Sequence, residues 1–246
     1  AEEKGKECNI SEKTVQNLLK QVSQPPQNRQ DFNTASLSGV KALSEEEVKS
    51  CLARQKGLVR EIVVRNGKFG FSDETGRIVI PCQWISAEPF CEGLALVQNN
   101  DKLYGFIDKM GVEIIPCKWY RATSFQEGRA RVRKPYDNPD DECFGYIDCA
   151  GNVVIPCHWK KADCKFSEGL AGVIHVEDNN VFWGRHNYRL KEDSVGYTAY
   201  IDKQDKIVIK GEFKELGIFV HGMAVVSDKN LKFGAIDKNQ EFLMEH

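Results

Sequence analysis

The stretch FGYIDCAGNVVIPCHW, residues 144–159, decides the fold of this chain because the chain repeats it. Close copies begin at Phe69 (FGFSDETGRIVIPCQW) and Tyr104 (YGFIDKMGVEIIPCKW), a weaker copy at Thr198 (TAYIDKQDKIVIKGEF) and a partial copy at Phe233 (FGAIDKNQEFL). A second signature follows the first four copies: FCEGLALV, FQEGRARV, FSEGLAGV and FVHGMAVV, starting at residues 90, 125, 166 and 219. The copies start 35, 40, 54 and 35 residues apart. Such periods are typical of arrays whose units bury their apolar faces only against one another.

Each copy predicts three short strands. In the copy at Tyr104, residues 104–108 form the first strand, 109–111 a turn, and 112–115 a second strand that Pro116 ends. Residues 128–133 form the third strand, which turns back into the first strand of the next copy. The sequence therefore predicts a mainly β fold, a tandem repeat array of short antiparallel strands. Its form is a curved, solenoid-like meander, with a closed ring as the alternative.

Partial units at both ends bear on that alternative. Residues 58–64 match a third strand before the first copy, and residues 233–243 supply only first and second strands after the last. In a closed ring these strands could pair, whereas an open array exposes its sheet edges. We favour the open array because a segment before the repeats can act as a cap.

That cap is helical. Residues 11–22 carry apolar residues at helical spacing, and residues 44–58 begin with a capping box at Ser44. A Gln-, Asn- and Ser-rich stretch, residues 24–38, lies between them. We expect a helical N-terminal cap over residues 1–57 and a repeat domain over 58–246.

The repeat unit resembles the WG-repeat family, also called KWG repeats, over residues 58–246. Typical units of that family read aromatic-Gly-Phe-Ile-Asp, a Gly turn, Ile-Val-Ile-Pro, then Phe-Ser-Glu-Gly-Leu-Ala. This chain departs from the pattern at Cys82, Cys117 and Cys157, and the copy at Thr198 lacks the Gly, the Pro and the Glu. The resemblance implies a scaffold or binding array, mostly bacterial, without a shared catalytic residue.

Composition excludes several classes of protein. The 246 residues are 28% charged and 41% hydrophobic, and no apolar run approaches the roughly 18 residues that a membrane span needs. The net charge of −2 gives no general attraction to nucleic acid. We therefore expect another protein or a surface glycan as the partner, and no nucleic acid; the sequence assigns no oligomeric state.

The nine cysteines bear on the cellular compartment. Six lie outside the repeat pattern, and in an exported protein they could form up to three disulfides, of which Cys8 with Cys51 is our one specific expectation. An N-terminus without Met fits a removed signal peptide or a trimmed chain. We predict an extracytoplasmic location, in the periplasm, at the surface or secreted, with a cytoplasmic protein of free thiols as the alternative.

Residues that recur among the copies have structural explanations. The Asp that ends each first strand suits the first position of a tight turn. The repeated tryptophans suit a core layer, although exposed tryptophans would favour sugar binding. The cysteines after the prolines suit a packed ladder, because paired zinc spacings do not occur.

Two departures from the repeat are the candidate binding residues. An enlarged loop, residues 175–196, carries aromatic and basic side chains of the kinds that anchor interfaces: Phe182, Trp183, Arg185, His186, Tyr188 and Arg189. One third strand places Arg129, Arg131 and Arg133 on one face, where they could receive carboxylates or phosphates. Packing of the loop on the array, and pairing of the arginines with the acidic loop 134–143, are the structural alternatives.

These observations predict a non-catalytic binding or protein-interaction module with no cofactor and no metal. A carbohydrate or cell-wall binder that uses exposed aromatics is the alternative. An enzyme with a site in the 175–196 loop is the third hypothesis, although catalytic motifs such as HExxH and GxSxG are absent from the sequence.

Overall fold

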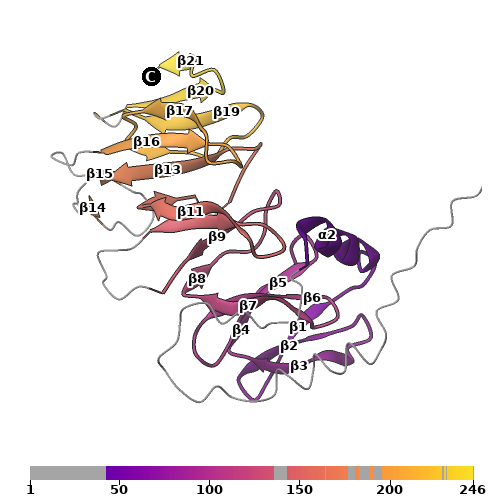
Figure 1. Cartoon of the computed structure of the whole chain (residues 1–246). Helices are drawn as coiled ribbons and strands as arrows, with labels where there is room; N and C mark the ends of the chain where they lie inside the picture. Colours follow the sequence, from indigo (N-terminus) through magenta and orange to yellow (C-terminus); the bar gives the residue numbers. More distant parts are fainter. Residues whose placement is uncertain are drawn as a thin grey trace, which may run out of the picture. The chain divides into compact units, whose positions relative to one another are not determined.

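The computed structural model describes residues 43–135, 143–163, 165–176, 181–182, 189–190, 196–228, 230 and 232–245. The chain divides into two compact units, residues 1–42 and 43–246. Every element described here belongs to the second unit (Figure 1). The predicted helix over residues 11–22 lies outside the described residues.

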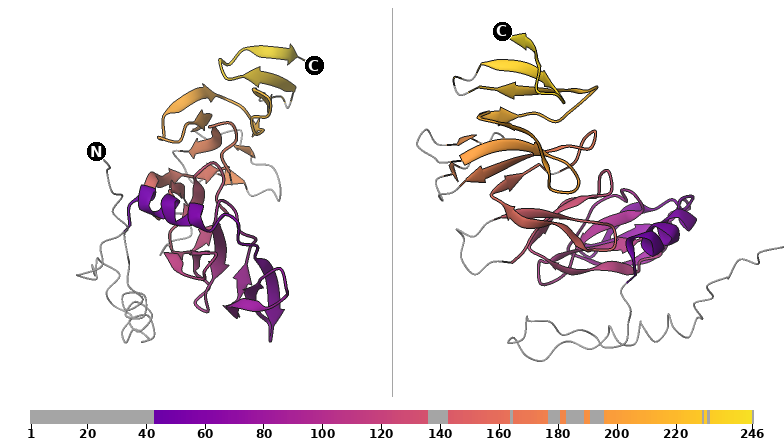
Figure 2. Two further views of the ribbon diagram at one scale, coloured as in Figure 1. Left: turned by 90° about the vertical axis from the view of Figure 1, so that its right-hand side faces the viewer. Right: turned by 45° about the horizontal axis from the view of Figure 1, so that its top comes forward.

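Five antiparallel sheets follow one another along the chain, in the order of the colours in Figures 1 and 2. Sheet 1 comprises β1 (Glu61–Arg65), β2 (Lys68–Ser72) and β3 (Ile78–Trp84). Sheet 2 comprises β4 (Ser86–Ala87), β5 (Leu94–Gln98), β6 (Tyr104–Asp108) and β7 (Glu113–Trp119). Sheet 3 comprises β8 (Arg121–Ala122), β9 (Ala130–Arg133), β10 (Phe144–Ile147) and β11 (Val153–Trp159).

Sheet 4 comprises β12 (Lys161–Ala162), β13 (Ala171–Val176), β16 (Gly196–Ile201) and β17 (Ile207–Gly211). Sheet 5 comprises β18 (Glu215–Leu216), β19 (Met223–Ser227), β20 (Phe233–Asp237) and β21 (Phe242–Glu245). A separate pair, β14 (Val181–Phe182) and β15 (Arg189–Leu190), lies between β13 and β16 in the chain. The predicted mainly β array of short antiparallel strands is confirmed.

Each sheet combines two copies of the repeat, as predicted. The third strand of one copy, such as β5, pairs with the first strand of the next, β6. The expectation that Pro116 ends the second strand is wrong, because β7 continues to Trp119. Pro116 is tolerated because β7 is an edge strand and the pairing with β6 is irregular at this point. The two-residue strands β4, β8, β12 and β18 were not predicted.

The turn explanation of the repeated Asp residues is confirmed. In sheet 3, Asp148 Oδ1 accepts hydrogen bonds from the backbone N–H groups of Ala150 and Asn152, both at 2.9 Å. The same pair of bonds recurs after β2, β6, β16 and β20. These carboxylates are used within their own turns.

Asp205 shows how the weaker copy compensates for its missing turn glycine. It has a φ of 67°, in the left-handed region where Gly111 and Gly151 stand in the copies at Tyr104 and Phe144. Its carboxylate accepts a hydrogen bond from Trp159 Nε1 at 2.8 Å and contacts His158 Nε2 at 2.8 Å. These contacts with sheet 3 offset the strain of a non-glycine residue at positive φ.

The repeated tryptophans are buried, as expected for a core layer. Trp84, Trp119 and Trp159 are 9%, 2% and 2% exposed. In the same strands Cys82, Cys117 and Cys157 lie half-buried beside glycines; a Cβ on Gly70 would lie 2.8 Å from Cys82 Sγ and 2.6 Å from a carbonyl oxygen. Burial raises the pKa of the Cys117 thiol far above its ordinary value. Seven cysteines of the described residues are free thiols, and Cys51 is one of them, so the structure does not show the expected disulfide between Cys8 and Cys51; Cys8 itself lies outside the described residues.

The helix predicted over residues 44–58 is present as α2 (Glu45–Arg54). Ser44 caps it, accepting a hydrogen bond from the Glu47 N–H, and the Glu47 carboxylate accepts a hydrogen bond from the Ser44 N–H at 2.8 Å. Val48 and Leu52 are buried in one core cluster with residues of sheets 2 and 3. Gln55, just after the helix, donates to Asp108 Oδ2 at 2.8 Å and accepts from the Lys109 N–H at 3.0 Å. The helix is thus fixed on the turn that follows β6.

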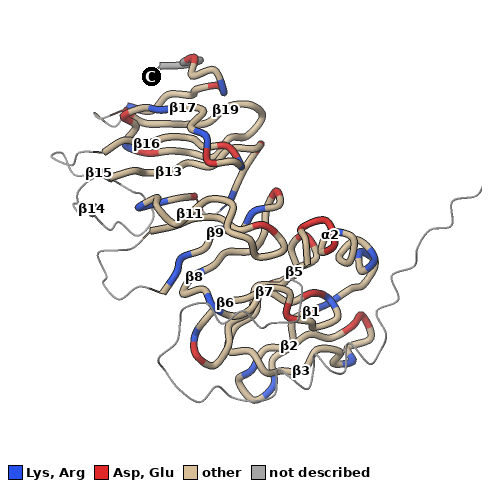
Figure 3. The backbone as a smooth tube through the Cα atoms, in the orientation of Figure 1, with Lys and Arg blue, Asp and Glu red and all other residues tan. Residues whose placement is uncertain are grey.

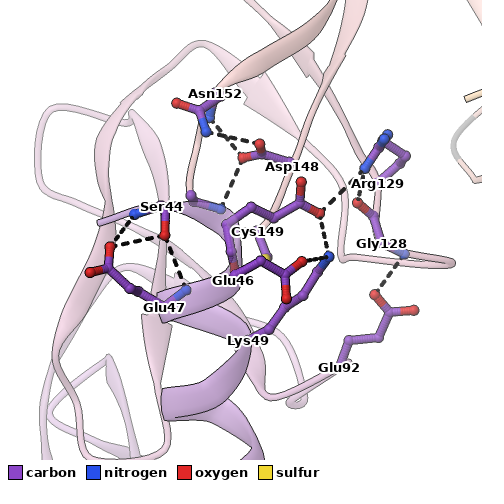
Figure 4. Close-up of polar contacts among 12 residues, drawn as sticks. Ser44, Glu46, Glu47, Lys49, Glu92, Gly128, Arg129, Asp148, Cys149 and Asn152 are labelled. Atoms are coloured by element: carbon purple, nitrogen blue, oxygen red, sulfur yellow. Dashed lines mark hydrogen bonds and ion pairs between the residues drawn. The ribbon is translucent and has the colours of Figure 1, made fainter. Parts of the chain in front are cut away.

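Polar contacts also join α2 to sheet 3 (Figure 4). Arg129 Nη1 lies 4.0 Å from Glu45 Oε1, and Cys149 Sγ lies 3.8 Å from the Glu45 carbonyl oxygen. Lys49 pairs with Glu45 and Glu46 on the exposed side of the helix. The helix therefore covers the place where sheets 2 and 3 adjoin.

Within the described residues, the five sheets form an open series. Among these residues, no strand of sheet 1 pairs with a strand of sheet 5. No helix of the described residues is long and apolar enough to cross a membrane.

Candidate functional site

Every sheet has two faces with different packing, which we name by direction along the chain. The backward face contacts the preceding sheet, and in sheets 2 to 5 it carries an Ala opposite an Ile. These pairs are fully buried: Ala95 and Ile107, Ala130 and Ile147, Ala171 and Ile201, Ala224 and Ile236. The forward face contacts the following sheet, as Leu94 and Leu96 of sheet 2 contact sheet 3.

An aromatic ring on each forward face packs against a Phe of the next sheet. The ring centroids lie 4.8–4.9 Å apart in four successive pairs: Phe71 with Phe90, Phe106 with Phe125, Tyr146 with Phe166, and Tyr200 with Phe219. The same aromatic contact therefore recurs at four successive interfaces between sheets.

A ladder of carboxylates adds polar contacts to these interfaces. Glu127 Oε1 and Oε2 accept hydrogen bonds from the N–H groups of Glu168 and Gly169 at 2.7 and 2.8 Å. Glu92 and Glu168 make the equivalent contacts with Gly128 and Gly222. The sequence analysis did not predict this contact with the next copy.

The ladder lowers the pKa of two carboxyl groups. Burial alone would raise the pKa of Glu127, but the N–H of Gly169, the Lys203 ammonium at 3.1 Å and the N–H of Glu168 outweigh it. The pKa of Glu168 is lowered in the same way, against desolvation, by Gly222 and Lys238. Sheet 5 has His221 at the ladder position, so the ladder stops where the described sheets stop.

The two ends of the series have different outer surfaces. The backward face of sheet 1 carries Glu61 opposite Ser72, in the place of the buried Ala and Ile pairs, and Ser72 is 2% exposed. Glu61 is exposed. A charged residue at this position suits water and would be costly to bury without a partner.

The forward face of sheet 5 is apolar and exposed. Met223, Val225 and Phe233 are 43%, 57% and 51% exposed, whereas Leu94 and Leu96, the equivalents of Met223 and Val225 in sheet 2, are 1% and 2% exposed. Ile218 and Val220, in the loop before β19, are 40% and 51% exposed. We call Met223, Val225 and Phe233 the sheet-5 forward face; large exposed apolar patches of this kind mark interaction sites.

One further feature distinguishes this face. Ala235 lies opposite Val225, at the position of the forward-face ring in the other four sheets. The sheet-5 forward face therefore lacks the aromatic side chain that inserts into a following sheet.

Comparison with protein families identifies the repeat. The family model described as "WG containing repeat" matches residues 69–102, 104–134, 144–175 and 199–231, more than half of the chain. This chain belongs to the WG-repeat family. The sequence comparison with curated proteins gives no match.

Solved structures with a similar arrangement are distant. BamB from Moraxella catarrhalis is 11% identical with a TM-score of 0.37, and the match covers 76% of this chain and 57% of that chain. The WD40 beta propeller domain of Doa1 is 13% identical with a TM-score of 0.34, and the match covers 76% of this chain and 64% of that chain. Kuenenia stuttgartiensis hydrazine synthase is 9% identical with a TM-score of 0.37, and the match covers 74% of this chain and 62% of that chain. This chain spans less than two thirds of the length of each.

In the WG-repeat array, the three predicted arginines contact the chain itself. Arg131 Nη1 donates to the Ala162 carbonyl oxygen at 2.6 Å, and its guanidinium lies 4.7 Å from the Phe144 ring centroid. Arg133 is 4% exposed and lies 4.6 Å from the Tyr120 ring. Arg129 donates to the Gly128 carbonyl oxygen and faces Glu45. Their role toward an external anion stays a prediction, as does pairing with the loop 134–143, most of which lies outside the described residues.

The predicted aromatic loop is described only in part. Phe182 and Arg189 are opposite each other in the β14–β15 pair. Trp183, Arg185, His186 and Tyr188 lie outside the described residues. The arrangement of the whole group therefore lies outside the described residues, and its binding role stays a prediction.

A metal centre is not formed by the described residues: they contain no group of three or more His, Cys, Asp or Glu side chains that could hold an ion. Charged residues of both signs are spread along the described chain (Figure 3). The feature of these residues that best fits recognition is the sheet-5 forward face.

Proposed function

We propose that this chain is a non-catalytic protein-interaction module and that a different protein covers the sheet-5 forward face. The observation that carries the proposal is the exposure of Met223, Val225 and Phe233 at positions that the following sheet covers elsewhere. Burying three such side chains favours association by several kcal/mol, at about 25 cal/mol per Å² of apolar surface.

The chemistry of the face indicates the partner. Four internal interfaces cover forward faces with apolar side chains, so the partner presents an apolar surface of its own. Because Ala235 replaces the forward-face ring, there is room above it for a large apolar side chain from the partner. An aromatic or Leu-rich segment of another protein meets both requirements.

A second copy of this chain fits less well. The complementary backward face of sheet 1 carries Glu61 and Ser72, and head-to-tail contact would bury the Glu61 carboxylate against Met223 and Val225. A glycan also fits less well, because the three repeated tryptophans of the alternative hypothesis are buried. The aromatic loop from Phe182 to Arg189 remains a candidate second contact. An extracytoplasmic location remains part of this proposal.

Site-specific photo-crosslinking in cells of the source organism tests the proposal. A benzophenone amino acid replaces Met223 in one variant and Met110, which is 61% exposed on the turn after β6, in the control. We expect a heterologous protein, identified by mass spectrometry, to be linked at position 223 and not at 110. Products that contain only this chain, or equal products at both positions, would contradict the proposal.

A further inference from the structure

A cavity of about 310 Å³ lies between sheets 4 and 5. Lys161, Asp163 and Gly172 line it from sheet 4, and Lys214, Glu215 and Leu216 line it from sheet 5. Val225 and Phe233 of the sheet-5 forward face also line it, whereas Met223 does not.

The cavity exists because two side chains of this interface are small. Gly172 of sheet 4 is equivalent to Arg131 of sheet 3 and to Leu96 of sheet 2. Thr198 of sheet 4 is equivalent to Phe144 of sheet 3 and to Tyr104 of sheet 2. The equivalence holds in the hydrogen bonds as well. Tyr146 Oη donates to the Asp163 carbonyl oxygen at 2.7 Å, and Tyr200 Oη donates to the Gly217 carbonyl oxygen at 2.6 Å.

In the preceding interface, an arginine of the chain occupies the corresponding space. The Arg131 guanidinium stacks on Phe144 and donates to the carbonyl oxygen of Ala162, the residue equivalent to Leu216. The interface between sheets 3 and 4 therefore shows how a guanidinium fits between two WG-repeat sheets.

The cavity supplies a carboxylate where the side chain is missing. Asp163 Oδ2 accepts a hydrogen bond from the Gly172 N–H at 2.7 Å, and a Cβ on Gly172 would lie 2.7 Å from the same oxygen. The carboxylate thus lies on the side of Gly172 where a side chain would project. Burial raises the pKa of the Asp163 carboxyl to about 6, and a cation in the cavity would stabilise its ionised form.

The opposite wall is more acidic than in the preceding interface. Glu215 stands where sheet 4 has Lys161, and Lys214 stands where sheet 4 has Lys160. Lys161 of the cavity corresponds to Arg121. The interface between sheets 3 and 4 thus holds the Arg131 guanidinium near three cationic residues, Arg121, Lys160 and Lys161. At the cavity the equivalent residues are Lys161, Lys214 and Glu215, so one cation is replaced by a carboxylate.

We propose that this cavity binds the guanidinium of an arginine side chain presented by a peptide. The guanidinium would lie between the Asp163 and Glu215 carboxylates and donate to the Leu216 carbonyl oxygen, as Arg131 donates to Ala162. The groups that would bind the guanidinium, the Asp163 and Glu215 carboxylates and the Leu216 carbonyl oxygen, are not part of the sheet-5 forward face, and Met223 does not line the cavity. Met223→Glu is expected to leave arginine binding unchanged.

Calorimetric titration of the whole chain with N-acetyl-arginine methylamide tests the proposal. The citrulline analogue, which has the same shape without the charge, and the lysine analogue are the controls. We expect saturable one-to-one binding of the arginine compound, about tenfold or more tighter than either control, since hydrogen bonds between charged groups are the stronger ones. In NMR spectra, the N–H signals of Gly172 and Gly217 should shift during the same titration.

Two variants separate binding from folding. Glu215→Lys introduces the residue that sheet 4 carries at this position, and Asp163→Asn retains an oxygen that can accept from Gly172. Each should weaken arginine binding about tenfold, with the circular dichroism spectrum of the folded chain unchanged. Equal binding of the arginine and citrulline compounds, no binding to the wild type, or unchanged binding by both folded variants would overturn the proposal.

Discussion

Sheet 1 and sheet 5 are both terminal sheets of the described array, yet their outer faces have opposite chemistry. Sheet 1 has Glu61 and Ser72 where every later sheet buries an Ala and an Ile. Sheet 5 keeps the apolar residues Met223 and Val225 on a face with no following sheet among the described residues. The first end therefore exposes the Glu61 carboxylate, whereas the other end exposes apolar side chains.

The largest expected effect comes from moving the chemistry of sheet 1 into an internal interface. Ala130 is fully buried between sheets 2 and 3, at the position that Glu61 occupies in sheet 1. Ala130→Glu should lower the free energy of unfolding by about 3 to 5 kcal/mol, because it buries an unpaired carboxylate. Urea unfolding followed by tryptophan fluorescence measures the change.

Glu61→Ala is the matched control and should change the free energy of unfolding by less than about 0.5 kcal/mol, since Glu61 is exposed. The comparison of the two ends fails if Ala130→Glu costs less than Glu61→Ala.

The carboxylate ladder gives a smaller contrast between the interior and the end. Glu127→Ala removes the acceptor of two backbone N–H groups, and should lower the free energy of unfolding by about 1 to 2 kcal/mol. His221→Ala, at the ladder position of sheet 5, should change it by less than about 0.5 kcal/mol. Thermal unfolding of both variants checks this pair, and equal losses would show that the ladder does not distinguish interior from end.

The ladder also predicts how stability depends on pH. The pKa values of Glu127 and Glu168 are lowered in the folded chain from the ordinary value of 4.5. Their contribution is therefore fully present above pH 4.5 and is lost as the pH falls through the lowered values. Urea midpoints measured from pH 7 to 3 should fall less steeply for the Glu127→Gln, Glu168→Gln double variant. A slope equal to that of the wild type would contradict the assignment.

The smallest effect on stability is expected at the proposed binding face. Met223→Glu and Met110→Glu change exposed side chains and should each alter the free energy of unfolding by less than about 0.5 kcal/mol. Chemical unfolding of the two variants measures this. A loss above 2 kcal/mol for Met223→Glu alone would mean that the face is covered within the chain.

The repeat pattern predicted the array because its signals are local. Strands are predicted by alternating apolar residues and by the Asp and Gly residues of the turns. Their order is predicted by the spacing of the copies, as for β5 and β6. Side-chain contacts between sheets are not local and were missed, as with the hydrogen bond that the Gly169 N–H donates to Glu127. A signal was present, since Glu recurs in three copies and is replaced by His221 in the last.

The candidate surfaces were missed for a related reason. Met223 and Val225 have the same pattern as Leu94 and Leu96, and only the arrangement of the sheets shows that one pair is uncovered. The cavity forms because Gly172 has no side chain where sheet 3 has that of Arg131. This difference becomes visible only when the two interfaces are compared. The sequence analysis instead selected large residues that depart from the repeat, such as the three arginines, as candidate binding residues.

The most direct test of the central claim is the affinity of the cross-linked partner, once purified, for Met223→Glu and for Met110→Glu. A charge in a desolvated apolar interface should cost about 2 kcal/mol or more, so the dissociation constant of Met223→Glu should rise about 30-fold. Met110→Glu should bind as the wild type does. Wild-type affinity of the folded Met223→Glu variant would show that the sheet-5 forward face is not the binding surface.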